Sequence, residues 1–255
     1  MLTLLAVRQS RWTDCSGTIL TLTWTSPEAF ICGAAAHVDE HNMQYNKPGN
    51  LLLGSTNHDT LQSYPDHKTI RPIVSASQNA SNALDAMRQT QDPWIYTPVV
   101  SSAHSECSGY AFTASFDHTV KIWNISDDGA TMKLKGTWEH DDRVNFVVAS
   151  SYHKRVATAS VSMSDAIRVY SLDGYEDDDI SKASFVAYCG NKASEQGEEV
   201  RRKEKWGYYP STIQWGISPR TANLLLVGWS PRSNSGEDLD IPEDKRNTGE
   251  ICLCE

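Results

Sequence analysis

A strand–turn–strand pattern that occurs twice in the middle of the chain constrains the fold more than any other feature. The first copy runs from Ala111 to Asn124, where two apolar segments flank the corner Phe116-Asp117-His118-Thr119 and the second segment ends in Trp123-Asn124. An Asp in such a corner can bond the backbone with its side chain. The second copy runs from His140 to Leu172 and has Tyr170 in place of Trp123, 47 residues later. Self-similarity at a period between 20 and 50 residues, roughly, indicates a repeat architecture, here of β units.

Two weaker copies flank this pair. One spans residues 18–64 and the other residues 212–255, and each contains three apolar segments of strand length. When the four copies are aligned on their third strand, one column holds Gly54, Trp123, Tyr170 and Cys254. The sequence therefore predicts an all-β protein made of about four similar sheets.

The Trp-Asn pair and its repetition resemble the WD40-repeat β-propeller family. A propeller blade is a four-stranded antiparallel sheet that is covered on both faces, and strands such as 146–149 and 224–227 are apolar throughout. The resemblance implies one WD40 domain over residues 1–255. Its expected blades are 15–67, 94–140, 141–190 and 208–255, with insertions at 68–93, 174–206 and 230–248 and a short helix at Ser81–Gln89.

About four blades are fewer than the roughly seven that usually close a WD40 ring, so we expect an incomplete ring. Residues Glu250–Cys254 read as a third strand without an outer partner, and Leu2–Val7 as a possible last strand of an otherwise absent blade. An open arc leaves two apolar blade faces and unpaired strand edges, which favour self-association.

The resemblance also implies a buried hydrogen-bonded network of His, Ser/Thr, Asp and Trp inside a blade. We expect one network in the third blade and a partial one, with its His displaced or missing, in the second blade. By position the residues are His140, Thr158, Asp165 and Tyr170 in the third blade, and Thr113, Asp117 and Trp123 in the second. On this interpretation Asp165→Ala should cost about 1–3 kcal/mol, because buried polar partners would be left unsatisfied.

Composition disfavours several other classes of protein. The formal net charge is −9, which disfavours direct binding to the nucleic-acid backbone. No apolar run reaches the length of a membrane span, and the first residues lack the basic region of a signal peptide. Six cysteines, far apart except for Cys252 and Cys254, read as reduced thiols, typical of an intracellular protein in the nucleus or cytoplasm.

Two short motifs could hold a metal, but structural roles are favoured for both. His37, Asp39 and His41 alternate along one segment, and Cys252 and Cys254 alternate along another; neither has the second ligand pair of a typical zinc site. Eight tryptophans raise the alternative of an aromatic cage for methylated lysine. Trp24, Trp123 and Trp215 fall inside strands, where packing is expected, whereas Trp94, Trp138, Trp206 and Trp229 lie nearer loops. No catalytic, cofactor or metal residue is assigned.

The function that these observations favour is a non-catalytic scaffold that docks partner proteins through loops on the faces of the propeller. The segments Gln44–Gly54 and Asp240–Asp244 resemble a fungal group of WD40 proteins related to a cullin-4-associated subunit of heterochromatin-forming histone methyltransferase complexes. That resemblance implies a chromatin-associated or ubiquitin-ligase complex, although Trp123-Asn124-Ile125-Ser126 lacks the Arg of the Trp-Asp-x-Arg motif. The alternatives are a propeller-fold hydrolase and a truncated fragment without independent function.

Overall fold

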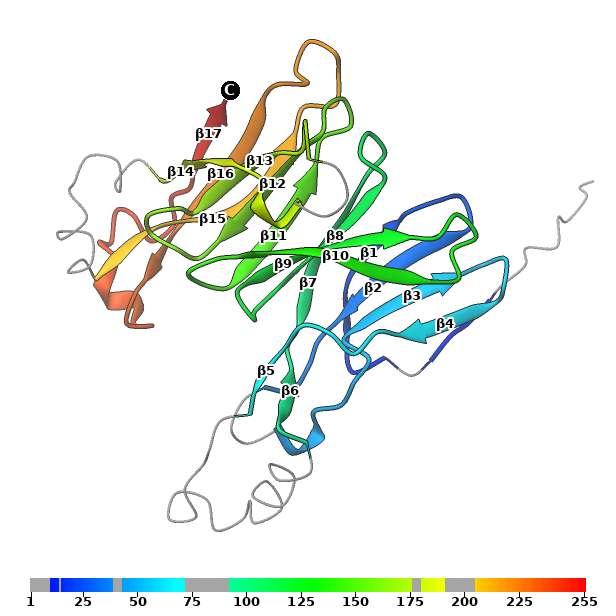
Figure 1. The fold of residues 1–255 in the computed structure, drawn as a ribbon. Coiled ribbons are helices and arrows are strands. Elements are labelled where there is room, and N and C mark those ends of the chain that lie inside the picture. Colours follow the sequence, from blue (N-terminus) through cyan, green and yellow to red (C-terminus); the bar gives the residue numbers. More distant parts are fainter. Residues whose placement is uncertain (1–9, 14, 39–42, 72–91, 176–179, 191–204) are drawn as a thin grey trace, which may run out of the picture.

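The computed structural model is a succession of antiparallel sheets that follow one another in chain order (Figure 1). It describes residues 10–13, 15–38, 43–71, 92–175, 180–190 and 205–255. The helix expected at Ser81–Gln89 and the strand expected at Leu2–Val7 lie outside these residues. The first and last sheets lie on opposite sides of the molecule, with the two middle sheets between them.

Three of the sheets are complete four-stranded blades. The first blade has the order β1-β2-β3-β4, the second β10-β9-β8-β7 and the third β11-β12-β13-β14. Their strands are β1 (Ile19–Trp24), β2 (Ala29–Ala34), β3 (Leu51–Ser55), β4 (Thr60–Ser63), β7 (Val99–Ser105), β8 (Tyr110–Ser115), β9 (Thr119–Ile125), β10 (Met132–Glu139), β11 (Val144–Ala149), β12 (Arg155–Ser160), β13 (Ile167–Ser171) and β14 (Phe185–Tyr188).

The fourth blade has three strands in the described part of the chain, β15 (Trp206–Trp215), β16 (Leu225–Ser233) and β17 (Glu250–Cys254). β17 pairs with β16 on one side and with no described strand on the other. A separate hairpin, β5 (Lys68–Ile70) with β6 (Trp94–Tyr96), projects from the connection between the first two blades. Short 3₁₀ turns occur at η1 (Met43–Tyr45), η2 (Ile180–Lys182) and η3 (Asp238–Asp240).

The strand register shows that the blades are repeats of one unit. In each blade the third strand places one residue of the predicted column opposite the start of the second strand. The pairs are Gly54–Phe30, Trp123–Ala111, Tyr170–Val156 and Cys254–Leu225. The all-β propeller arc predicted from the sequence is confirmed.

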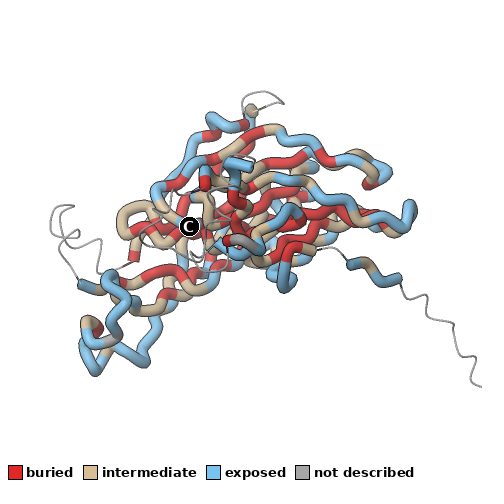
Figure 2. The backbone as a smooth tube through the Cα atoms, turned by 90° about the horizontal axis from the view of Figure 1, so that it is seen from below, coloured by how far each residue is buried: buried red, intermediate tan, exposed pale blue. Residues whose placement is uncertain are grey.

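The core lies between the blades, because side chains alternate between the two faces of each strand. Ala111 and Trp123 of the second blade pack on the first blade, whereas Phe112 and Ile122 pack on the third. A further apolar cluster joins the third and fourth blades. Buried residues accordingly follow the strands through the interior, and hairpin tips are exposed (Figure 2).

Some local expectations need correction. β16 continues to Ser233, so the loop expected from Ser230 begins later, after the strand has paired with the start of β15. Trp24, expected in the core, is 61% exposed, because no blade formed by the described residues covers its face of the first blade. Trp138 and Trp229, expected near loops, are both buried.

Among the described residues, the sheets form an arc and no strand pairing joins the first blade to the fourth. Within the same residues, no helix has the length and apolar character needed to span a bilayer.

Candidate functional site

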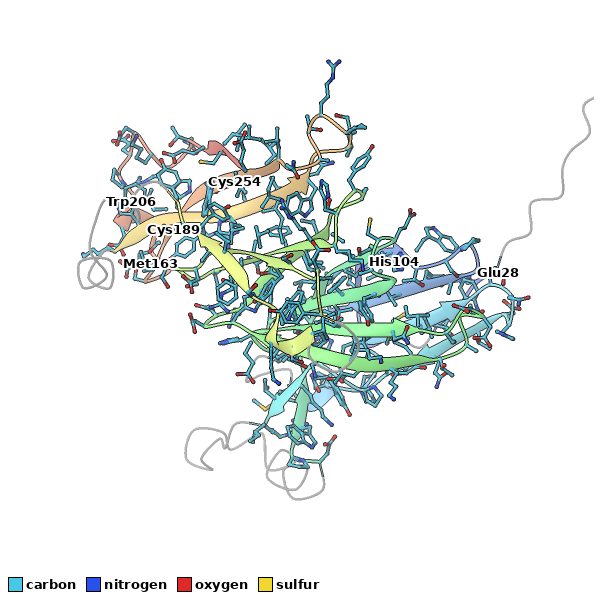
Figure 3. The ribbon with its side chains drawn as sticks, turned by 45° about the horizontal axis from the view of Figure 1, so that its top comes forward. Glu28, His104, Met163, Cys189, Trp206 and Cys254 are labelled. Atoms are coloured by element: carbon cyan, nitrogen blue, oxygen red, sulfur yellow. The ribbon has the colours of Figure 1, made fainter. Side chains whose placement is uncertain are left out.

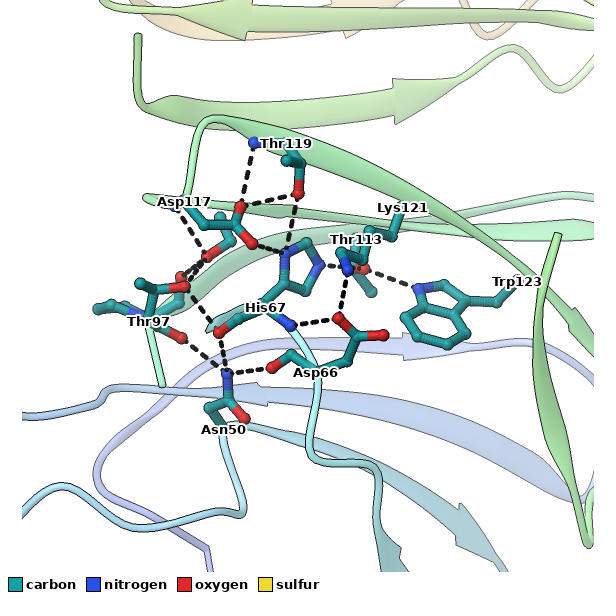
Figure 4. Close-up of polar contacts among 11 residues, drawn as sticks. Asn50, Asp66, His67, Thr97, Thr113, Asp117, Thr119, Lys121 and Trp123 are labelled. Carbon is teal, nitrogen blue, oxygen red and sulfur yellow. Dashed lines mark hydrogen bonds and ion pairs between the residues drawn. The ribbon is translucent and has the colours of Figure 1, made fainter. Parts of the chain in front are cut away.

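The second blade contains a closed hydrogen-bonded network around His67 (Figure 4). The imidazole Nδ1 lies 2.9 Å from Asp117 Oδ2, and Nε2 lies 2.7 Å from Thr113 Oγ1. Trp123 Nε1 donates to the same Thr113 oxygen at 2.8 Å. The Asp117 carboxylate also accepts from the amide and the hydroxyl of Thr119. His67, Thr113 and Trp123 are at most 2% exposed, so water does not compete for these bonds.

A second layer of contacts holds the backbone that carries His67. The side-chain amide of Asn50 donates to the carbonyl oxygens of Asp66, His67 and Thr97. His67 has φ of +52°, in the left-handed region that non-glycine residues rarely adopt. This backbone conformation is therefore fixed by Asn50 and by Thr97, whose amide and hydroxyl also bond the His67 carbonyl.

The network sets the protonation of Asp117. Burial raises the pKa of this carboxyl, but the neighbouring His67 and the hydrogen bonds from His67 and Thr119 outweigh burial, and the pKa lies below its usual value. Asp117 is therefore held as a carboxylate that accepts hydrogen bonds.

Sequence reasoning brought Thr113, Asp117 and Trp123 together but regarded their His as displaced or missing. The structure supplies His67 from the end of the first repeat, 46 residues before Thr113. The available signal was Asp66-His67 itself, which stands where the family has Gly-His. Residues 68–93, the expected insertion, separate His67 from the second blade in the sequence. His67 was therefore assigned to the first repeat and not to the blade that it joins.

In the third blade the corresponding residues do not form a closed network. His140 Nε2 lies 2.8 Å from Thr158 Oγ1, but His140 Nδ1 is buried and has no hydrogen-bond partner among the described residues. Asp165 does not reach His140, and its carboxylate, 35% exposed, lies 3.3 Å from Arg168 Nη2. The network predicted for this blade is thus reduced to the His140–Thr158 pair.

Arg168 takes over part of the missing polar contacts. Its Nη1 donates to the Glu139 carbonyl at 2.7 Å, and Nη2 lies 3.3 Å from Asp141 Oδ2. Burial, together with the positive charge of Arg168, lowers the pKa of His140 to about 4. Tyr170 stacks on Trp138 with ring centroids 3.8 Å apart.

Both networks lie inside blades, so they can rigidify the scaffold but offer no surface to a partner. An accessible site lies between the third and fourth blades, where a cleft of about 730 Å³ opens. The loop before β11, the loop after β12, β15 and the end of β16 form its walls. The lining residues are Asp141, Asp142, Arg143, Val161, Ser162, Met163, Tyr209, Arg232, Ser233 and Asn234.

The lining of the cleft combines a few apolar side chains, among them Val161 and Met163, with charges of both signs. Tyr209 is 8% exposed, and its hydroxyl donates to Asn234 Oδ1 at 2.5 Å. Burial, with a contribution from nearby Asp142, raises the pKa of Tyr209, so the phenol stays protonated and donates. Figure 3 shows Met163 and Trp206 on the same side of the molecule, beside the start of β15. Such a surface can pair its charges with a polar segment that carries acidic and basic side chains.

The cleft residues were not identified from the sequence, because they come from two blades and belong to no motif. Their signal is positional: Asp141-Asp142-Arg143 immediately precede a first strand, and Val161-Ser162-Met163 immediately follow a second strand. Loops at one end of neighbouring blades meet in space, which only the order of the sheets reveals.

The motifs considered for metal binding do not form a site among the described residues, where no cluster of three or more His, Cys, Asp or Glu side chains could hold an ion. Asp39, Glu40 and His41 lie outside those residues. Cys252 and Cys254 pack against the apolar cluster between the third and fourth blades.

Comparisons with known proteins support the fold. No protein-family model matches the chain, and no curated protein matches it in sequence. Among solved structures, the chain is similar to one described as "Structure of Dos1 propeller", with a TM-score of 0.58 and 19% identity over 94% of this chain and 48% of that chain. It also matches the Cps50 (Swd1) β-propeller domain of Myceliophteria thermophila, with a TM-score of 0.47 and 11% identity over 84% of this chain and 50% of that domain. The chain thus spans about half the length of the propellers it matches, and it has a β-propeller fold.

Proposed function

We propose that this protein is a non-catalytic interaction scaffold that binds segments of partner proteins in the cleft between its third and fourth blades. The cleft itself is the observation that carries the proposal. It has the size of a ligand site, its walls combine two loops with the strands β15 and β16 of a rigid scaffold, and its charges point to a polypeptide that carries both acidic and basic side chains.

The chemistry of the cleft favours binding over hydrolysis. Neither His nor Cys is among its lining residues. The hydroxyl of Ser162 lies 3.4 Å from that of Ser164, which is not a base that could activate it. Covalent catalysis needs a nucleophile with an adjacent general base, and the described lining lacks that pair.

The direct experiment pans a phage-displayed library of random ten-residue peptides against the purified chain. Enriched peptides should contain both acidic and basic residues. Their affinity, measured by isothermal titration calorimetry, should fall at least tenfold, roughly 1.4 kcal/mol, in the double variant Asp142→Lys, Arg232→Glu. Lys133→Glu, an exposed charge reversal on β10 far from the cleft, is the matched control and should leave the affinity unchanged.

Peptides in which acidic and basic residues are exchanged should bind the double variant better than the wild type. Absence of enrichment, or equal binding to wild type and the double variant, would refute the cleft as the docking site.

The setting of this scaffold is a further part of the proposal. The resemblance of Gln44–Gly54 and Asp240–Asp244 to fungal WD40 proteins favours a multiprotein complex associated with chromatin or with a ubiquitin ligase, and hence the nucleus. A fluorescent fusion expressed in a fungal cell tests the location: exclusion of the fusion from the nucleus would contradict it.

A further inference from the structure

Two apolar surfaces lie at opposite ends of the arc. The first end face, on β1, exposes Leu20, Leu22 and Trp24 at 44%, 64% and 61%. The last end face, on β16 and β17, exposes Leu226, Ile251 and Leu253 at 47%, 78% and 59%. Contiguous exposed apolar residues of this kind mark interaction surfaces.

The last end face repeats a surface that is buried elsewhere in the molecule. Leu226 pairs with Leu253 in the register position at which Phe112 pairs with Ile122 in the second blade. Phe112 and Ile122 are 0% exposed, because they pack against the third blade. The last end face therefore has the side-chain pattern of a surface that the next blade covers.

The first end face resembles the other side of that contact, the surface of the third blade that packs against the second. Leu22 lies opposite Cys32 as Val147 lies opposite Thr158 in the third blade. Val147 is 1% exposed and belongs to the apolar cluster that contains Phe112. The two end faces are thus complementary to each other in the way that the facing surfaces of adjacent blades are.

We propose that two copies of this chain associate head to tail, with the last end face of each copy packed on the first end face of the other, to close one ring. The proposed occupant is a second copy because one chain carries both halves of this contact, one at each end of the arc. A rotation of 180° about the ring axis would place both pairs of end faces in contact, and a head-to-tail contact that closes gives a finite, symmetric assembly. This inference is independent of the docking cleft, which lies between blades within one copy.

The test is sedimentation equilibrium of the purified chain. The wild type should have twice the 28.4 kDa mass of one chain. Leu22→Asp and Leu253→Asp should each raise the dimer dissociation constant at least 100-fold. Leu239→Asp, a matched change at a leucine that is 80% exposed outside both end faces, should leave the dissociation constant unchanged.

Mixing the two variants distinguishes the head-to-tail arrangement from contacts between identical faces. In a mixed dimer, the intact first end face of Leu253→Asp meets the intact last end face of Leu22→Asp. One full contact is restored, so the mixture should dimerise more tightly than either variant alone.

Circular dichroism confirms that each variant is folded, and Leu20→Asp with Ile251→Asp form a second pair if either fails. A monomer at all concentrations, open oligomers larger than two, or no recovery on mixing would each overturn the proposal.

Discussion

The second and third blades carry similar residues at equivalent register positions, yet the residues make different contacts. The imidazole of His67 lies within hydrogen-bond distance of Asp117, Thr113 and Thr119, whereas that of His140 has one such partner among the described residues, Thr158. The turn between the second and third strands explains the difference. Residues 116–118 separate β8 from β9, whereas residues 161–166 separate β12 from β13. The short corner directs the Asp carboxylate inward, and the longer one leaves it at the surface beside Arg168.

Aromatic packing compensates in the third blade. Trp123 donates a hydrogen bond to Thr113, but Tyr170 stacks on Trp138 and packs against Phe185, whose ring is tilted. Aromatic pairs add about 0.5–1.5 kcal/mol beyond their burial. The comparison teaches that one blade geometry can be stabilised by a polar network or by stacked rings, according to the length of one turn.

The largest expected difference in stability is between two single variants, in which His67 or His140 is replaced by alanine. His67→Ala should lower the free energy of unfolding by about 3–5 kcal/mol, because it leaves the buried Asp117 carboxylate without its partner. His140→Ala should cost about 1–3 kcal/mol, since only Thr158 loses a bond. Urea denaturation of both variants measures the difference, and equal losses would show that the third-blade network is as important as the second.

Mild acid should lower the stability of the protein through His140 in the third blade. The pKa of His140 is about 4 in the folded protein and about 6.5 when unfolded, so the unfolded chain binds the extra proton between these values. The contribution of His140 to the free energy of unfolding is fully present above pH 6.5 and decreases as the pH drops towards 4. The total decrease is about 3 kcal/mol. Urea midpoints from pH 7 to pH 4 test this, and the decline should be shallower in His140→Gln; an unchanged slope would contradict the assignment.

Replacing Asp117 in the second blade should cost more stability than replacing Asp165 in the third, as for the two histidines. Asp117→Ala should cost about 1–3 kcal/mol, because His67 and Thr119 lose a buried acceptor. Asp165→Ala should cost under about 1 kcal/mol, because its contact with Arg168 is partly exposed. This replaces the larger cost expected for Asp165 from the sequence. Thermal melts of the two variants measure this difference. A cost for Asp165→Ala as large as for Asp117→Ala would support the buried network expected for the third blade from the sequence.

The smallest effect should come from Arg168→Met. The guanidinium is buried, with Nε lacking a hydrogen-bond partner among the described residues, and its carboxylate partners Asp141 and Asp165 are both exposed to water in part. An apolar side chain of similar length should change stability by less than about 1 kcal/mol. A loss above about 2 kcal/mol in urea denaturation would show that Arg168 holds the third blade together.

Repeating strands were predictable from the sequence because apolar segments recur with the same corner and the same aromatic column. The column that holds Trp123 and Tyr170 is enough to align two blades from the sequence alone. Asp66-His67 could be recognised in the sequence, but its assignment to the second blade could not, since its partners Thr113 and Asp117 lie 46 and 50 residues away across an insertion. The cleft and the two end faces depend on which sheet follows which in space, and Trp24 shows the limit: a strand-like tryptophan is buried only if a neighbouring blade covers it.

The span of the His67 contacts has a consequence for folding kinetics. Its partners are 46 and 50 positions away along the chain, and contacts of such sequence separation form slowly, because a long loop must first lose its freedom. Loop-closure entropy grows only by about 0.6 kcal/mol for each doubling of length, so the segment between His67 and the second blade can lengthen at little thermodynamic expense. Interactions completed after the rate-limiting step leave folding unchanged and slow unfolding. If the His67 network forms after that step, it slows unfolding without changing the folding rate, and so lengthens the time for which the second blade keeps the segment that carries His67.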